Sequence, residues 1–329
     1  MRKVRVAQIG TSQNSHGASI IRSLVKQSEL FEVVGYVLPE NEREKFPGSM
    51  AAFDGLRELT LDEVLNDPTV EAVTVETEEI YLTKYALLAA QHGKHIHMEK
   101  PGGIEPTAFE ELIAAVKAGG RVFHTGYMYR YNPAVSELLE RIDRGELGEI
   151  HSVEAQMSCF HTDEVRAWLG TFPGGMMFFL GCHLIDLALR IMGTPETVTP
   201  FNRSLTQNGA EDYGMAVLGY PHGTAIIKTD AAEKGGFMQR QLVVTGSKMT
   251  AEIRPLECFG EEGRHYTEVT YTAGDGWTDR GETVRSEQYD RYDAMMAAFA
   301  AMVRGDKQNP YTYDYESTLY KTILQCCGG

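Results

Sequence analysis

The stretch VRVAQIGTSQNSHG, at residues 4–17, decides the fold of the first half of the chain. Residues 4–9 alternate in the manner of a strand, and apolar side chains recur at helical spacing within residues 18–27. A strand that ends in a glycine turn and continues into a helix is the first part of a βαβ unit. The opening of the chain therefore predicts a parallel sheet.

The same alternation of strands and helices continues through residue 122. Further strands are predicted at residues 32–38, 71–75, 95–98 and 122–125, with helical stretches between them. We expect an α/β domain over residues 1–122, a Rossmann-like, doubly wound parallel sheet that binds a nucleotide.

The pattern changes in the second half. Longer strands at hairpin spacing are predicted at residues 151–159, 197–204, 215–220, 223–229, 242–246 and 249–254, and a helix at 182–192. We expect an α+β domain over residues 123–329, with a large, mainly antiparallel sheet that leaves one face open for a substrate or a second subunit. A final helix at about 312–327 is expected to pack back on the first domain.

Composition excludes several classes of function. The chain has 329 residues, 43% of them hydrophobic, and a formal charge of −15, which disfavours nucleic acid and anionic lipid as partners. It shows no signal-peptide pattern and no apolar run of transmembrane length. Five cysteines form no CxxC pair, so we expect a cytoplasmic protein without a metal site.

The turn after the first strand is a modified dinucleotide-binding turn. Of the three glycines in the G-x-G-x-x-G pattern only the first, Gly10, is present, and Ser12 and Ser15 stand at the other two. Ser12 can still offer its N–H and hydroxyl to a pyrophosphate at a helix N-terminus. A capped turn that holds no ligand is the alternative. The candidate cofactor residues here are Gly10, Thr11, Ser12, Ser15 and His16.

The end of the second strand departs from the pattern as well. Leu38 stands where an acidic residue for the adenosine ribose is expected, and Glu40, two residues later, is the candidate substitute. No arginine follows immediately to receive a 2′-phosphate. The cofactor is therefore expected to be NAD rather than NADP.

Three motifs then carry a family resemblance. They are GKHIHMEKP at 93–101, GYMYRYNP at 126–133 and GGMMFFLGCHLID at 174–186. In this order, the motifs resemble those of the glucose-fructose oxidoreductase / inositol dehydrogenase / MocA family. The resemblance implies that Lys100 lies at the nicotinamide and the substrate hydroxyl, with Glu99, Pro101 and Thr77 also near the cofactor.

Two residues differ from that family's pattern. Phe179 replaces a carboxylate that helps to position substrate, although His183 and Asp186 are retained, and Leu82 replaces a histidine that follows Thr77 in the family. Pro101 is expected to bias Lys100 toward an extended backbone that aims its side chain into the crevice.

We expect NAD(P)-dependent hydride transfer at a secondary alcohol of a sugar, polyol or glycoside. Oxidation of an alcohol also requires a base, and histidine is mostly neutral at pH 7 whereas lysine is not. His183 is thus the expected base and Lys100 the cation that polarises the oxygen, unless burial lowers the pKa of Lys100. The alternatives are a cofactor-retaining enzyme that cleaves glycosides by transient oxidation, and a non-catalytic sensor of nucleotides or sugar phosphates.

Further residues are candidates for lining a carbohydrate-like substrate. They are Tyr127, Arg130, His161, Trp168, Phe179 and Asp186. The resemblance also implies a homodimer or homotetramer. The sequence does not identify the sugar or the number of subunits.

Overall fold

The computed structural model describes residues 2–206 and 209–329, which form two compact units. Unit 1 consists of the chain up to Met128 together with Tyr292–Ser317, and unit 2 consists of Tyr129–Arg291 and Thr318–Gly329. Unit 1 therefore extends beyond residue 122 and includes a segment from near the C-terminus.

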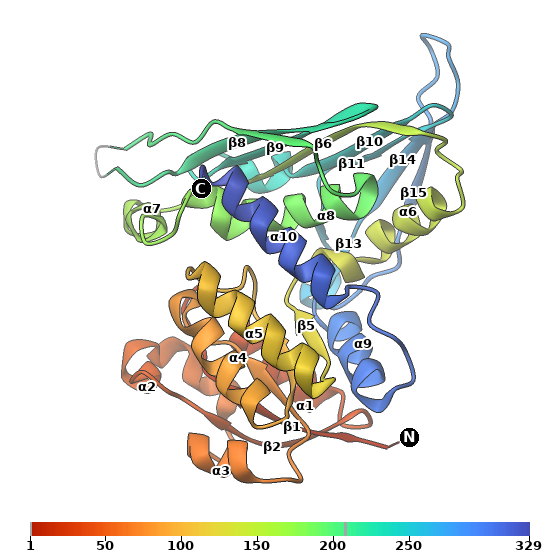
Figure 1. The fold of residues 1–329 in the computed structure, drawn as a ribbon. Coiled ribbons are helices and arrows are strands. Elements are labelled where there is room, and N and C mark those ends of the chain that lie inside the picture. The colour runs from red at the N-terminus through yellow and green to blue at the C-terminus, as the bar shows by residue number, and fades with distance from the viewer. Residues whose placement is uncertain (1, 207–208) are drawn as a thin grey trace. The chain divides into compact units, whose positions relative to one another are not determined.

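Unit 1 contains the predicted parallel sheet (Figure 1). Its strands are β1 (Val4–Ile9), β2 (Phe31–Val37), β3 (Ala72–Val75), β4 (His95–Met98) and β5 (Phe123–Thr125), in the order β2-β1-β3-β4-β5. The helical segments are α1 (Gly17–Lys26), α2 (Glu42–Lys45), η1 (Pro47–Phe53), α3 (Leu61–Asn66), η2 (Glu79–Tyr81), α4 (Leu82–Gln91), α5 (Pro106–Gly119) and α9 (Asp293–Arg304). The Rossmann-like fold class is confirmed.

A sixth strand position is reduced to a single bridge at the edge of this sheet. Tyr36 of β2 pairs in parallel with Glu58, and its backbone bonds to Arg57 and Leu59. Gly35 permits this contact, because a Cβ there would lie 2.4 Å from the carbonyl oxygen of Arg57. With the bridge included, the strand order follows the Rossmann arrangement, and the order reverses between β1 and β3.

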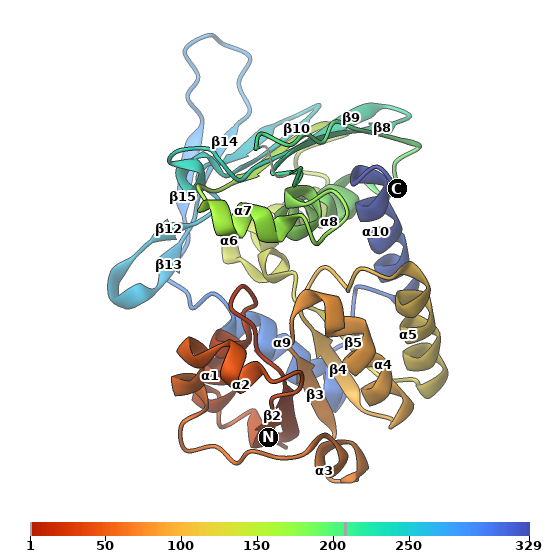
Figure 2. The same ribbon diagram turned by 90° about the vertical axis from the view of Figure 1, so that its left-hand side faces the viewer.

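Helices cover both faces of the parallel sheet (Figure 2). Phe123 of β5 meets Phe109 of α5, whereas the next residue, His124, stacks on Phe299 of α9. Since neighbouring strand residues point to opposite faces, α5 and α9 lie on opposite sides. Helix α4 packs on α5 and α9 on α1, so the strands between them are buried on both faces.

Unit 2 is built on an eight-stranded sheet of order β15-β14-β11-β10-β6-β9-β8-β7. The strands are β6 (Ile150–Ser158), β7 (Thr197–Pro200), β8 (Tyr213–Tyr220), β9 (Gly223–Asp230), β10 (Gln241–Gly246), β11 (Thr250–Ile253), β14 (Glu268–Thr272) and β15 (Glu282–Arg285). Strands β6 and β9 pair in parallel and the other pairs are antiparallel, which confirms the mainly antiparallel prediction. Strand β7 ends at Pro200, four residues before the predicted end.

Helices cover one face of this sheet. They are α6 (Pro133–Asp143), α7 (Asp163–Leu169), a π-helical turn η4 (Met177–Gly181), α8 (Cys182–Met192) and the end of α10 (Tyr313–Cys326). Along β9 the side chains of Ala225 and Ile227 are buried, whereas Thr224 and Ile226 are exposed. The alternation shows that the second face is open. Among the described residues, no helix has the length and apolar character needed to span a bilayer.

We predict that Gly10→Ala destabilises the protein by about 2–3 kcal/mol. Gly10 has φ +86°, and a Cβ there would lie 2.8 Å from the backbone of Thr77. Urea unfolding followed by circular dichroism would measure the loss. Gly55→Ala is the matched control, because Gly55 has φ +78° but nothing within 4 Å of the added Cβ. Equal losses in the two variants would contradict a close approach at Gly10.

Candidate functional site

The turn between β1 and α1 is closed by its own serines. The N–H of Ser12 donates to Oγ of Ser15 at 3.0 Å, and the N–H of Ser15 donates to Oγ of Ser12 at 2.9 Å. The hydroxyl of Ser15 donates to the carbonyl oxygen of Glu76, which follows β3. These reciprocal bonds hold the turn without the two missing glycines.

A carboxylate that the sequence did not indicate reaches this turn. Glu42, the first residue of α2, is fully buried, and its Oε2 accepts the N–H of Thr11 at 3.0 Å. Burial raises the pKa of Glu42 to about 8 against the lowering effect of that bond. Glu40 is held elsewhere, because Lys84 and Tyr85 donate to its carboxylate. The sequence indicated Glu40 and not Glu42, because the burial of Glu42 depends on how the chain folds around it.

The residues around Gly10 fit the adenosine end of a dinucleotide. Oε1 of Glu42 and Oγ1 of Thr11 are buried and, within the described residues, have no hydrogen-bond partner. A ribose hydroxyl can donate to such a carboxyl oxygen, and Gly10 allows close approach. Leu38, half-buried at the end of β2, offers no polar group.

Three buried carboxyl groups lie at the carboxyl ends of β3 and β4. Glu76, Glu79 and Glu99 are each at most 3% exposed, as is Lys100. Burial, then the charges of Glu99 and Glu79, raise the pKa of Glu76 well above its usual range. Burial raises that of Glu79 to about 7. The site thus concentrates titratable groups next to the motif lysine.

Glu99 is the ionised member of this group. Burial alone would raise its pKa, but His16, Lys100 and His97 together lower it. Nδ1 of His16 lies 3.2 Å from Oε2 of Glu99, and Nζ of Lys100 lies 3.8 Å from Oε1. His16 of the turn and Lys100 after β4 therefore lie on either side of the same carboxylate, Glu99.

A pair of histidines lies beside these carboxyl groups. Nδ1 of His97 is 2.8 Å from Nδ1 of His124, and Nε2 of His97 is 3.4 Å from Oε1 of Glu76. Burial lowers the pKa of His97 to about 4, so its ring is neutral near pH 7. Thr77 and Pro101 are also buried in this part of unit 1, as is Tyr127.

In unit 2, His183 lies on α8 and is 3% exposed. Its ring meets Tyr129 edge-on, with centroids 5.2 Å apart. The Tyr129 hydroxyl donates to Glu257 and accepts from Arg240, whose guanidinium also lies 2.7 Å from Sγ of Cys159. Arg240 and Glu257 were not foreseen, because isolated charges near strand ends carry no sequence signal.

The remaining candidates in unit 2 form two groups. Arg130 and Asp186 make a buried two-pronged ion pair, at 2.8 and 2.6 Å, so each neutralises the other. Phe179 stacks with Phe172 and meets the edge of Trp168, with centroids 5.0 Å apart for the latter pair. Phe179, for which the resemblance implied a carboxylate, is thus part of an aromatic cluster. His161 is half-buried. Burial, and to a smaller extent the positive charge of Arg240, lower the pKa of its ring.

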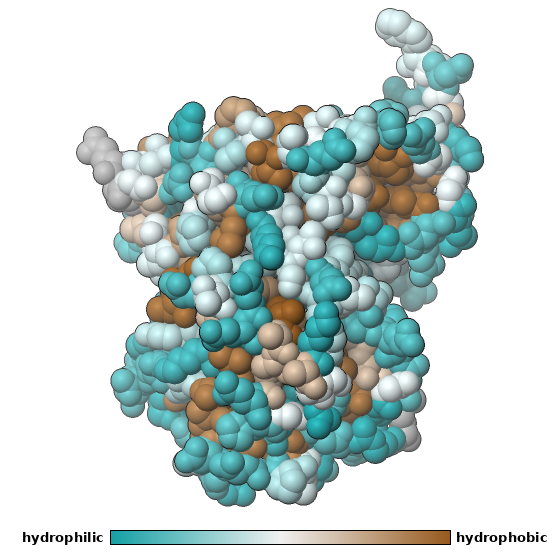
Figure 3. Space-filling view, in the orientation of Figure 1, coloured by the Kyte–Doolittle hydropathy of each residue, from teal (hydrophilic) through white to brown (hydrophobic). Residues whose placement is uncertain are grey.

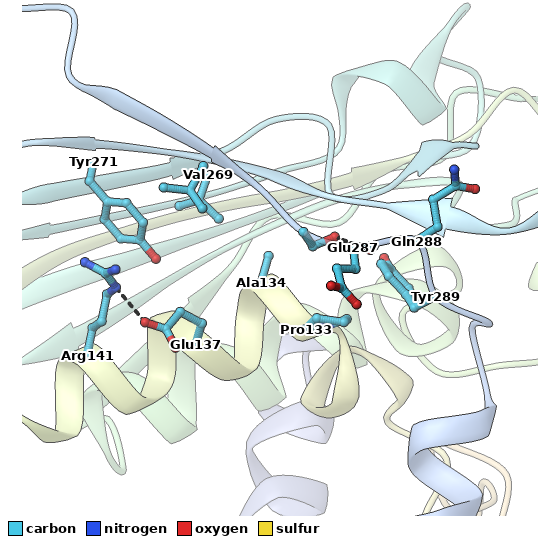
Figure 4. A pocket seen from close by; sticks show the side chains of 11 residues that line it. Pro133, Ala134, Glu137, Arg141, Val269, Tyr271, Glu287, Gln288 and Tyr289 are labelled. Carbon is cyan, nitrogen blue, oxygen red and sulfur yellow. Dashed lines mark hydrogen bonds and ion pairs between the residues drawn. The ribbon is translucent and has the colours of Figure 1, made fainter. Parts of the chain in front are cut away.

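A separate apolar pocket of about 360 Å³ lies in unit 2 between α6 and the strands β14 and β15 (Figures 3 and 4). Val269 and Ala134 contribute to its walls, and Arg141 lies over the ring of Tyr271. The predicted site residues are not among those that line it. We therefore give this pocket no part in the site.

Comparison with known proteins finds two family models that together match most of the chain. Residues 4–127 match "Oxidoreductase family, NAD-binding Rossmann fold", and residues 135–252 match "GFO/IDH/MocA C-terminal domain". The oxidoreductase YhhX of Escherichia coli is 31% identical over 265 residues, 71% of this chain and 72% of that protein. The NAD-dependent scyllo-inositol 2-dehydrogenase of Bacillus subtilis is 26% identical over 267 residues, 78% of this chain and 74% of that protein.

Solved structures show the same fold at low identity. The aldose-aldose oxidoreductase of Caulobacter crescentus superimposes with a TM-score of 0.79 at 20% identity, covering 99% of this chain and 98% of that one.

We predict that Glu42→Gln becomes increasingly stabilising relative to wild type as the pH rises from 5 to 8. The folded-state pKa of Glu42, about 8, exceeds its unfolded value, so the native state binds the extra proton. Stability is then full below the unfolded pKa and falls by up to about 1.4 kcal/mol per pH unit until the folded pKa is passed. The amide cannot ionise, so E42Q lacks this loss.

Urea unfolding at pH 5, 6.5 and 8 would measure the difference. Glu44→Gln, exposed on the same helix, is the control and should follow wild type. A difference between E42Q and wild type that stays constant with pH would show that Glu42 is not a buried acid.

Proposed function

Because the chain belongs to the GFO/IDH/MocA family of oxidoreductases with an NAD-binding Rossmann fold, we propose that it transfers hydride between NAD and a secondary alcohol of a sugar, polyol or glycoside. The observation that carries the proposal is the buried Lys100, beside the ionised Glu99 at the carboxyl end of β4. Ligands of doubly wound sheets bind at this edge. The names of similar proteins, among them scyllo-inositol dehydrogenases, support a polyol.

Glu42 supports NAD as the cofactor. Its buried Oε1 can accept a hydrogen bond from a ribose hydroxyl, whereas a 2′-phosphate is bulkier and has no hydroxyl there to donate. The bound dinucleotide would supply the hydride acceptor. Gly10 and Thr11 would approach the ribose, while the closed serine turn would offer the pyrophosphate fewer amides than a glycine turn does.

Lys100 and His183 are the residues that we assign to the alcohol. Lys100 can polarise the oxygen or take its proton, and a neutral His183 can also act as base. The cluster of Phe179, Trp168 and Phe172 supports a substrate with an apolar ring face, since aromatic rings pack well against C–H groups.

The open face of the unit 2 sheet supports self-association. Ile226 is 39% exposed there, and apolar side chains on an exposed sheet face can form part of a protein–protein interface. We assign the homodimer or homotetramer to this face.

We predict that the protein binds NADH at least about tenfold more tightly than NADPH, a difference of about 1.4 kcal/mol. Fluorescence titration would measure both affinities, and mass spectrometry of denatured protein would detect retained dinucleotide. Glu42→Ala should weaken NADH more than NADPH, with Glu44→Ala as control. Equal affinities would contradict the role of Glu42. Neither binding nor co-purification would favour a non-catalytic sensor instead.

We predict that Lys100→Met and His183→Ala each slow the hydride step by roughly 10²–10⁴-fold. Stopped-flow absorbance of NADH would follow the reaction with a panel of inositols and aldoses. The exposed Lys117 and His92 provide matched controls, K117M and H92A. Near-normal rates in both site variants would end the assignment. Product formed from glycosides without added NAD would indicate the cofactor-retaining cleavage reaction.

A further inference from the structure

A line of titratable groups joins Lys100 to the surface of unit 1. Nζ of Lys100 lies 3.8 Å from Oε1 of Glu99, and Oε2 of the same carboxylate lies 3.2 Å from Nδ1 of His16. The Lys100 and Glu99 side chains are each 2% exposed, whereas that of His16 is 25% exposed. His16 is therefore where this line meets water.

The other groups around Glu99 do not continue the line. Glu76 follows β3 and Glu79 begins η2, and burial raises the pKa of Glu76 well above its usual range and that of Glu79 to about 7. His97, on β4, is neutral and contacts His124, which is buried against Phe299 of α9. Both of these histidines are at most 1% exposed, whereas the His16 side chain is 25% exposed and meets water.

We propose that Glu99 and His16 carry protons between Lys100 and solvent, which makes Lys100, rather than His183, the group that exchanges the proton of the alcohol. The inference rests on the proposed alcohol oxidation and deepens it. Glu99 and His16 act through Lys100 and are positioning residues, without contact to the substrate.

The proton balance is closed. As the alcohol is oxidised, its hydroxyl proton passes to the amine of Lys100, which has first released its own proton along the relay. The ammonium that forms gives one proton to Oε1 of the Glu99 carboxylate, and rotation of the resulting carboxylic acid delivers that proton to Nδ1 of a neutral His16 whose hydrogen is on Nε2. The resulting imidazolium releases one proton from Nε2 to water. One proton leaves the alcohol oxygen and one enters solvent, and no electrons move along the relay.

Two details favour a relay over a fixed ion pair. Oε1 of Glu99, toward Lys100, accepts no hydrogen bond from any described residue, so it can receive a proton. His16 is held at the start of α1 by the serine turn and by ring contact with Tyr292 at 5.1 Å. An imidazole is the side chain best suited to exchange protons with water near neutral pH.

Chemical rescue tests the relay during turnover. With the alcohol that reacts in the panel, His16→Ala should lower kcat by about 10–10²-fold, and added imidazole should restore it in proportion to its concentration. The comparison is made at saturating cofactor, because His16 also belongs to the candidate cofactor turn. His92→Ala, which removes an exposed histidine, should lose nothing and gain nothing from imidazole. A full kcat in H16A, a loss that imidazole does not repair, or rescue of H183A instead would overturn the proposal.

A second measurement needs neither substrate nor cofactor. In protein labelled with ¹³C at the glutamate carboxyl carbons, the Glu99 signal, identified by its absence in Glu99→Gln, should titrate at higher pH in H16A and in K100M than in wild type. His16 and Lys100 both lower the pKa of Glu99, so removal of either must raise it. H92A should leave the signal unchanged.

The rescue experiment and the carboxyl titration together distinguish failure of the relay from failure of the proposed function. Shifts in the carboxyl titration without turnover of any alcohol would sink the proposed function and leave the charge coupling intact. Turnover with an unmoved Glu99 titration would sink the relay alone. His16→Asn provides a second variant of similar polarity should H16A fold poorly.

Discussion

An ionised carboxylate, Glu99, kept away from water at the end of β4 is the constraint on which this edge of the parallel sheet depends. An isolated buried charge is costly, and the chain offsets it from three directions. The turn supplies His16, the next residue supplies Lys100, and Gly126 leaves space, since a Cβ there would lie 3.2 Å from Oε2. Burial and then the same charge raise the pKa of Glu76, so that one carboxyl group ionises while its neighbour stays neutral.

The serine turn acquires a physical reason in this arrangement. A glycine turn leaves its amides free for phosphate, whereas Ser12 and Ser15 satisfy each other. Ser15 also bonds to the end of β3, which fixes the residue after it, His16, over Glu99. Serines in place of glycines thus limit how closely a ligand can approach the turn and hold the imidazole of His16 in place. Glu42 adds to this by holding the N–H of Thr11.

Periodicity in the sequence predicted most of the strands, and the 95–98 strand at its observed bounds, because side-chain alternation is a local property. Strands β14 and β15 were not predicted. The motif lysine was also found from the sequence. Glu42, Arg240 and Glu257 were missed because their burial depends on where distant elements pack. That Arg130 and Asp186 line the substrate stays a prediction. The two bind each other, a pairing across 56 positions that no local pattern reports. The expectation that Glu40 holds the ribose stays a prediction, and Lys84 and Tyr85 both donate to Oε1 of that carboxylate.

The single bridge between Tyr36 and Glu58 has a consequence for the behaviour of the protein in a crowded cell. An unpaired edge of a sheet is a template for another chain. Here the N–H and carbonyl of Tyr36 are occupied by Arg57 and Leu59. Residues 57–59 thus cover this part of the β2 edge, and another chain cannot pair with Tyr36 without displacing them.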